Sequence, residues 1–97
     1  MRRNDAIQAI HEALPSLKER FGVAELALFG STARDEAEPG SDIDILVTFE
    51  GPASFDRFMG LEETLSALLG GKVDLVTHKA LKPLVKASVE KDLIHVA

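Results

Sequence analysis

The feature that most constrains the fold is the alternation of side chains in residues 42–49, where Asp42 and Asp44 alternate with Ile43, Ile45 and Val47. Successive side chains of a β-strand point to opposite faces of its sheet. The segment is therefore predicted to be a strand whose two carboxylates share one face, while the isoleucines and the valine share the other. Such an apolar face must be buried under another layer of secondary structure.

The flanking segments supply the remaining elements. Apolar residues spaced by three and four predict a helix over residues 5–21, with Asn4 or Asp5 as its cap and Gly22 at its end. Pro15 predicts a kink in this helix or a break into two short helices. After this helix we predict a buried strand over 24–29 and a short helix or turn over 31–36. A further helix is predicted from the cap residue Ser54 to Leu69, with Phe55 and Leu68 on or near its apolar side. The last predicted elements are a third strand over 72–77, a helix starting near Pro83 and a short strand over 93–96.

This order of elements predicts an α/β (α+β) fold, a small mixed β-sheet with helices packed on it. The chain has 97 residues, which fits a single domain over residues 1–97. It has no Cys, so thiolate metal sites and Cys nucleophiles are excluded. The sequence shows neither a signal-peptide pattern nor an apolar run of about 18 residues. A cytoplasmic protein that does not enter a membrane is therefore expected.

Acidic residues are concentrated in the middle of the chain, whose net charge is −5. Residues 35–63 hold nine acids against one base, Arg57. Phosphate backbones are bound by clustered Lys and Arg, so long nucleic acid is not expected as a partner. An acidic patch suits divalent cations or a basic partner protein, and is otherwise a solvated surface.

Asp42 and Asp44 are candidate metal ligands. Two carboxylates on one face of a strand raise each other's pKa and destabilise the fold unless a cation neutralises them. Mg²⁺ is commonly held by one or two carboxylates together with phosphate oxygens and water. The alternative is an edge strand that carries two solvated acids.

Gly30 and Ser31 follow a predicted strand and precede a predicted helical turn. Glycine lets the backbone approach a phosphate closely, and the start of a helix offers N–H groups to an anion. The alternative is an ordinary turn in which Ser31 is a helix cap. Arg34, one helical turn later, could bind a β- or γ-phosphate. It could equally pair with Asp35, Glu36 or Glu38 on the surface.

Asp74 interrupts an otherwise apolar strand between Val73 and Leu75. If this strand lies beside the strand over 42–49, Asp74 can join Asp42 and Asp44. It could then help to hold a second metal ion, or take the proton from an attacking hydroxyl. The alternative is a solvated acid at the end of a strand.

Three segments together resemble the signature of the DNA polymerase β-like nucleotidyltransferase superfamily. They are Gly30-Ser31-x-x-Arg34, Ser41-Asp42-Ile43-Asp44 and Val73-Asp74-Leu75-Val76. The short length and the helix over 55–69 resemble the minimal nucleotidyltransferase branch, and the resemblance extends from Phe21 to about Ile94.

The resemblance implies a role for each residue of the signature. Gly30, Ser31, Arg34 and Ser41 would bind ATP. Asp42, Asp44 and Asp74 would form a catalytic triad around Mg²⁺, with two metal ions expected, and Asp74 would activate the acceptor. Many members of the branch are antitoxins paired with a HEPN-domain toxin, to which they transfer AMP on a tyrosine hydroxyl. The same reaction and partner are therefore expected here.

The chain departs from the family pattern at Asp35, where Gly usually follows the Arg. This carboxylate could hinder triphosphate binding, or the loop could point outward. Two other functions remain open from the sequence. One is an antitoxin that neutralises its partner by contact alone. The other is a transferase acting on a small molecule, which normally needs an additional acceptor-binding region.

Overall fold

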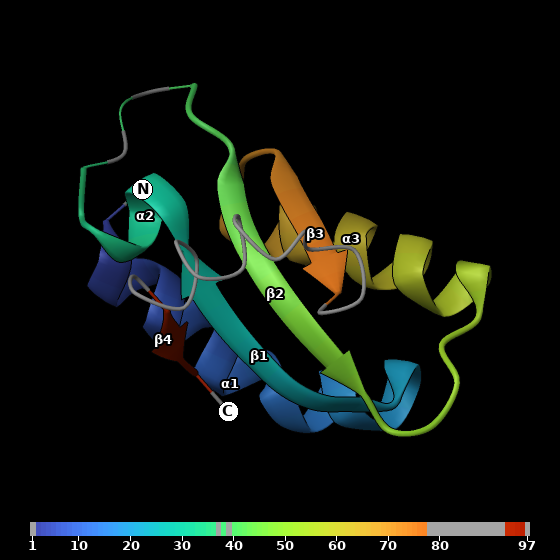
Figure 1. Cartoon of the computed structure of the whole chain (residues 1–97). Helices are drawn as coiled ribbons and strands as arrows, with labels where there is room; N and C mark the ends of the chain where they lie inside the picture. Colours follow the sequence, from blue (N-terminus) through green and yellow to red (C-terminus); the bar gives the residue numbers. More distant parts are fainter. Residues whose placement is uncertain (1, 37, 39, 78–92, 97) are drawn as a thin grey trace.

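The computed structural model describes residues 2–36, 38, 40–77 and 93–96. In chain order its elements are α1 (Arg3–Phe21), β1 (Val23–Phe29), α2 (Gly30–Ala33), β2 (Ile43–Phe49), α3 (Phe55–Leu69), β3 (Val73–Thr77) and β4 (Ile94–His95). The strands form one sheet in the order β3-β2-β1-β4 (Figure 1). β1 is antiparallel to β2 and β4, whereas β2 and β3 are parallel. The predicted mixed sheet with packed helices is confirmed.

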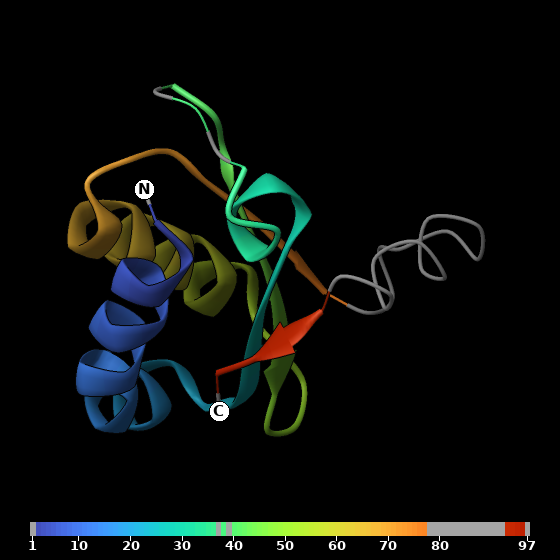
Figure 2. The same ribbon diagram turned by 90° about the vertical axis from the view of Figure 1, so that its left-hand side faces the viewer.

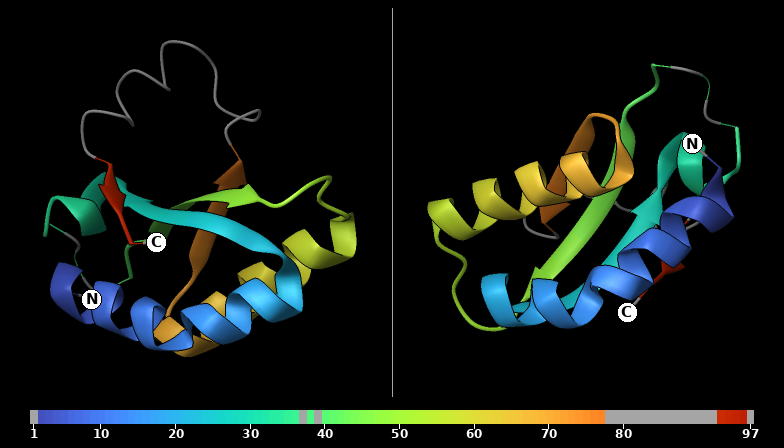
Figure 3. Two further views of the ribbon diagram at one scale, coloured as in Figure 1. Left: turned by 90° about the horizontal axis from the view of Figure 1, so that it is seen from below. Right: turned by 180° about the vertical axis from the view of Figure 1, so that it is seen from behind.

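Both long helices cover the same face of the sheet, as the edge-on views show (Figures 2 and 3). The core lies between these two layers, where the apolar residues of β2 alternate inward as predicted. Its fully or almost fully buried members include Ile10, Leu17, Leu26, Leu28, Ile43, Ile45, Val47, Leu61, Leu65, Val73 and Leu75. The two helices approach closely, since a Cβ added at Gly60 would lie 2.9 Å from Cε1 of Phe21.

Helix α1 differs from its prediction at two points. It runs unbroken through Pro15, so the predicted alternative of two short helices is wrong. Ile10 before the proline and Leu17 after it are both buried in the core. This packing holds the segments on either side of the proline in one continuous helix. Neither Asn4 nor Asp5 is the cap: the N-cap position is Arg2, which makes no side-chain capping bond. The predicted end is confirmed, with Gly22 in the left-handed conformation.

Helix α3 begins and ends as predicted. The Ser54 hydroxyl accepts a hydrogen bond from the Arg57 N–H, and Gly70 ends the helix in the left-handed conformation. Two of its apolar residues do not lie in the core, because Phe55 is 77% and Leu68 is 40% exposed. Phe55 is the first residue of the helix.

The remaining predictions on secondary structure hold with small shifts. β2 begins at Ile43, so Asp42 precedes the strand instead of opening it. The short helix occupies Gly30–Ala33, and the last strand is confirmed at Ile94–His95. The helix predicted from Pro83 lies outside the described residues. No helix of the described part of the chain is long and apolar enough to cross a membrane.

Candidate active site

The site is built around Asp44, which the sheet places between the two neighbouring strands. Asp44 pairs in register with Phe29 of β1 on one side and with Asp74 of β3 on the other. Paired residues of adjacent strands direct their side chains to the same face. The expected adjacency of the second and third strands is therefore confirmed. Two aspartates are thus paired near the starts of β2 and β3, two parallel strands that lie side by side in the sheet (Figure 1).

Gly30 brings the turn after β1 directly against this pair. Its φ is +70°, a conformation that L-residues with a side chain rarely adopt. A Cβ at this position would collide with Oδ2 of Asp44 and would lie 3.1 Å from its Cγ. The backbone of the Gly30-Ser31 turn and the Asp44 carboxylate therefore line one cradle that any side chain at position 30 would fill.

The electrostatics of the cradle favour a bound cation. Burial raises the pKa of Asp44 above its ordinary value of 3.8, and the negative charges of Asp74 and Asp42 raise it further. The positive charge of Arg34 acts in the opposite direction on the same pKa. The carboxylates of Asp42 and Asp74 thus repel the partly buried carboxylate of Asp44. A divalent cation would relieve their repulsion, so the residues present fit Mg²⁺.

Asp42 is exposed, as Asp74 is, whereas Asp44 is partly buried. Asp42 lies in the loop before β2, next to Ser41, whose hydroxyl accepts a hydrogen bond of 3.2 Å from the Glu38 N–H. The Ser41 N–H in turn donates to the Glu38 carbonyl over 3.0 Å. Ser41 therefore closes a turn that leads the chain into Asp42.

The carboxylates do not form a complete metal cage by themselves. Within the ranges that the structure describes, no group of three or more Asp, Glu, His or Cys side chains has a geometry that could hold a metal ion. Magnesium sites in phosphate-transferring proteins typically combine one or two carboxylates with phosphate oxygens. Any cation held here would therefore need further oxygen ligands besides these carboxylates.

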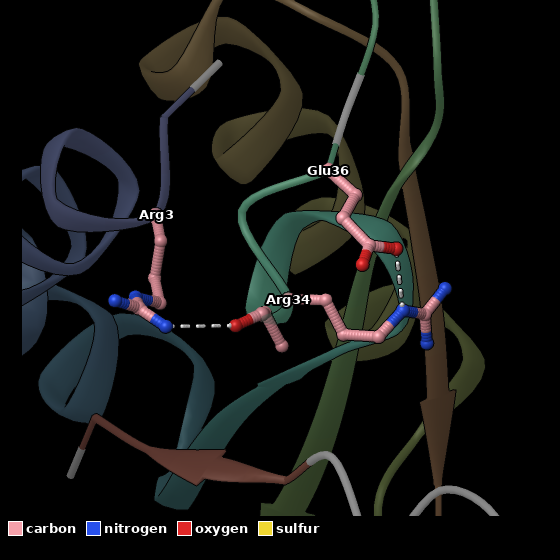
Figure 4. A network of polar contacts seen from close by, with 4 residues as sticks. Arg3, Arg34 and Glu36 are labelled. Atoms are coloured by element: carbon pink, nitrogen blue, oxygen red, sulfur yellow. Dashed lines mark hydrogen bonds and ion pairs between the residues drawn. The ribbon is translucent and has the colours of Figure 1, made fainter.

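Arg34 directly follows α2. Its sequence position allows either a phosphate contact or a surface ion pair. Its Nε donates to Oε2 of Glu36 over 3.1 Å, in an ion pair whose side chains are 43% and 67% exposed (Figure 4). At the same time its charge stabilises the ionised form of Asp44. Of the three surface acids that the sequence offered as partners, Glu36 is the one that forms this ion pair, and the guanidinium also lowers the pKa of Asp44.

The structure shows three further residues at the site that the sequence analysis did not single out. Nη1 of Arg3 donates to the carbonyl of Ala33, the last residue of α2, over 3.4 Å (Figure 4). The hydroxyl of Ser66 accepts a bond of 3.2 Å from the N–H of Val73, which fixes the start of the strand that carries Asp74. Thr32, which directly follows the Gly30-Ser31 turn in α2, is fully buried. No local sequence signal marks these residues, since each acts on a segment distant in sequence or through burial.

Comparison with known proteins agrees with this geometry. The model of the nucleotidyltransferase domain family matches residues 10–96. Protein adenylyltransferase MntA from Thermococcus cleftensis is 49% identical over 80 residues, which cover 82% of this chain and 81% of that protein. A solved minimal nucleotidyltransferase superposes with a TM-score of 0.80 at 36% identity, over 97% of this chain and 95% of the other.

A more distant neighbour shares the fold. It comes from the complex of a tri-AMPylated Shewanella oneidensis HEPN toxin with its MNT antitoxin, at a TM-score of 0.66 and 20% identity, over 94% of this chain and 71% of the other. The family match covers nearly the whole chain and includes Gly30, Asp42, Asp44 and Asp74. The chain therefore belongs to the nucleotidyltransferase domain family, among its minimal members.

Proposed function

We propose that this protein transfers AMP from ATP to a hydroxyl group of a partner protein, and that it thereby acts as the antitoxin of a HEPN-domain toxin. The observation that carries the proposal is the pairing of Asp44 with Asp74 in register, against a glycine turn that leaves no room for a side chain. This arrangement places paired carboxylates beside a backbone that a triphosphate can approach closely.

The residues of the site divide into phosphate-binding and metal-binding groups. Gly30 and Ser31 would bind the triphosphate through the backbone and the Ser31 hydroxyl, and Arg34 would add a charged donor. Ser41 would orient the loop that presents Asp42, in keeping with its bonds to Glu38. Asp42, Asp44 and Asp74, together with oxygens of the triphosphate, would hold Mg²⁺, in two ions, which would neutralise charge on the transferring phosphate.

The transfer itself is a displacement at the α-phosphorus. The oxygen of the acceptor hydroxyl forms the new bond to this phosphorus, and the bond to the oxygen bridging the α- and β-phosphates breaks. Pyrophosphate leaves with the electron pair of the broken bond. Asp74 is suited to take the proton of the hydroxyl, because it is exposed and directly beside Asp44.

The position of Asp74 also supports a protein as the acceptor. β3 is an edge strand of the sheet as the structure describes it, so a side chain on a bulky partner can reach Asp74 without entering a deep pocket. The relative from Thermococcus cleftensis carries the name of a protein adenylyltransferase. The Shewanella oneidensis neighbour was solved with a HEPN toxin modified by AMP. A tyrosine hydroxyl of such a toxin, in the cytoplasm, is the acceptor that the proposal names.

The test is mass spectrometry of the toxin encoded beside this protein, after incubation with the purified protein, ATP and Mg²⁺. We expect a mass gain in AMP units. Asp74→Asn should abolish this gain, whereas Asp56→Asn should retain it. Asp56 is the matched control because it is also an exposed aspartate, but lies in the first turn of α3.

Neutralisation of the toxin in cells distinguishes the remaining functions. If Asp42→Ala and Asp74→Asn protect cells as well as the wild type and no AMP is transferred, the protein is a binding antitoxin and the catalytic proposal is wrong. A screen of small hydroxylated acceptors covers the third function. Transfer to one of them but not to the toxin would contradict a protein acceptor.

A further inference from the structure

Asp35 has an unusual backbone conformation. Its φ is +58°, and among the described residues it is the only non-glycine with a positive φ. This left-handed conformation is unfavourable for residues with a side chain, although Asp and Asn tolerate it better than most. A compensating interaction of the side chain is therefore expected.

That interaction is a cap on a helix distant in sequence. Oδ1 of Asp35 accepts a hydrogen bond of 3.0 Å from the N–H of Arg3, the first residue of α1. The first N–H groups of a helix have no partner within the helix, and the residue at the N-cap position makes no side-chain bond here. The Asp35 carboxylate supplies this partner and places a negative charge at the positive end of the helix dipole.

Arg3 makes a second contact with the same segment, and both contacts end on residues that directly follow the Gly30-Ser31 turn, Asp35 and Ala33. The Arg3 guanidinium donates to the carbonyl of Ala33 (Figure 4). The N–H of Asp35 donates to the Thr32 carbonyl over 3.1 Å, and the N–H of Glu36 donates to the Ser31 carbonyl over 2.8 Å. The carbonyl end of the turn is thus held against α1, while Gly30 faces Asp44.

We infer that Asp35 is a positioning residue for nucleotide binding: by capping α1 it holds the Gly30-Ser31 turn in the conformation that receives the triphosphate. The inference rests on the proposed function. A turn that is already ordered loses less conformational freedom when the ligand binds. The bond to Arg3 also directs the carboxylate towards α1, so its charge serves the helix instead of opposing the phosphates.

The test separates the hydrogen bond from its surroundings with five variants. Asp35→Gly keeps the backbone conformation and removes the acceptor, whereas Asp35→Asn keeps an acceptor oxygen and tolerates a positive φ. Arg3→Pro removes the donor N–H at a position where helices accept proline. Arg2 before it already has an extended backbone, with φ −79° and ψ 148°, as the residue before a proline requires. Arg3→Ala removes the guanidinium alone, and the double variant Asp35→Gly/Arg3→Pro measures coupling.

The measurements are the Kd for a non-hydrolysable ATP analogue with Mg²⁺, the kcat of AMP transfer at saturating ATP, and amide hydrogen exchange of residues 31–33 without nucleotide. Asp35→Gly and Arg3→Pro should each raise Kd by roughly fivefold, the size of a lost cap, and speed exchange in the turn. Their kcat should stay close to wild type. The double variant should bind no more weakly than Arg3→Pro, because the Asp35 acceptor has no donor left in that background. Asp35→Asn should bind as the wild type does, and Arg3→Ala, which removes only the guanidinium bond to Ala33, should have a smaller effect than Arg3→Pro.

Two outcomes would contradict the inference, and they differ in what else they contradict. If the wild type binds the analogue and both variants bind it as tightly, while only their unfolding temperature falls, Asp35 is a helix cap without a role in binding. If the wild type itself does not bind the analogue, the proposed function fails, and the positioning role fails with it.

Discussion

At the scale of single residues, Asp44 is subject to charge repulsion from its neighbours. Its carboxylate is partly buried and faces Asp74 and Asp42, and all three influences raise its pKa above 3.8. The folded protein therefore binds a proton at Asp44 more tightly than the unfolded chain does. The stability that comes from this protonation is fully present below pH 3.8 and is lost as the pH rises through the folded-state pKa.

This sign leads to a prediction for Asp44→Asn. Without ligands at pH 7 the variant should unfold at a higher temperature than the wild type, because the repelling charge is gone. The difference should shrink as the pH falls towards and below 3.8, where the wild-type carboxyl is protonated. Thermal unfolding followed by circular dichroism between pH 3 and 8 measures it. Glu63→Gln, an exposed change on α3, is the control, and an Asp44→Asn variant less stable than wild type at pH 7 would contradict the argument.

Thr32 gives a second prediction at the residue scale. Its side chain is fully buried, and its hydroxyl oxygen has no hydrogen-bond partner in the described structure. Thr32→Val has nearly the same shape and removes an unsatisfied polar group, so it should stabilise the fold by about 1 kcal/mol. Chemical denaturation measures this change. Thr32→Ser, which keeps the hydroxyl and loses a methyl group, should destabilise instead, and a destabilised Thr32→Val would show that the hydroxyl has a partner in solution.

At the scale of elements, the long helix α1 tolerates a residue that usually ends a helix. Pro15 cannot donate the hydrogen bond that an N–H would make to the preceding turn, yet the helix continues to Phe21. Burial of Ile10, Leu17 and Phe21 against the sheet and α3 compensates for the lost bond. Helices in proteins owe most of their stability to such packing.

Pro15→Ala should therefore stabilise the protein. Position 15 is exposed, so the change restores a backbone hydrogen bond without disturbing the core, and a gain of about 1–3 kcal/mol is expected from helix propensity. The measurement is the free energy of unfolding in urea. Ser16→Ala, at the neighbouring exposed position, controls for a general effect of alanine. A loss of stability in Pro15→Ala would mean that the helix is shaped around the proline.

At the scale of the whole molecule, binding should make the fold markedly more stable, because the ligand neutralises the acidic cradle. A ligand at one hundred times its Kd stabilises the native state by about 2.7 kcal/mol. For a domain of this size, 1 kcal/mol shifts Tm by about 4–8 °C. ATP with Mg²⁺ should therefore raise Tm by roughly ten degrees or more.

The acidic residues of the site also predict that this stabilisation by ATP requires Mg²⁺. ATP with EDTA should raise Tm far less, since the triphosphate would then face Asp42, Asp44 and Asp74 without a neutralising charge. Asp44→Asn should lose most of the shift caused by ATP with Mg²⁺. Differential scanning fluorimetry compares the conditions, and an equal shift with and without Mg²⁺ would contradict a metal-dependent site.

The sequence by itself determined the pattern of the fold and pointed to the acidic residues of the candidate site. Alternation predicted β2, helical spacing and caps predicted α3, and the apolar neighbours of Asp74 marked it as exceptional, because each signal lies within a few consecutive residues. Only the tertiary structure decided that Asp44 and Asp74 are register partners and that Gly30 touches Asp44. It alone decided that Asp35 caps α1. These contacts join residues from 14 to 32 positions apart, and strand order and helix packing, not local pattern, bring such residues together.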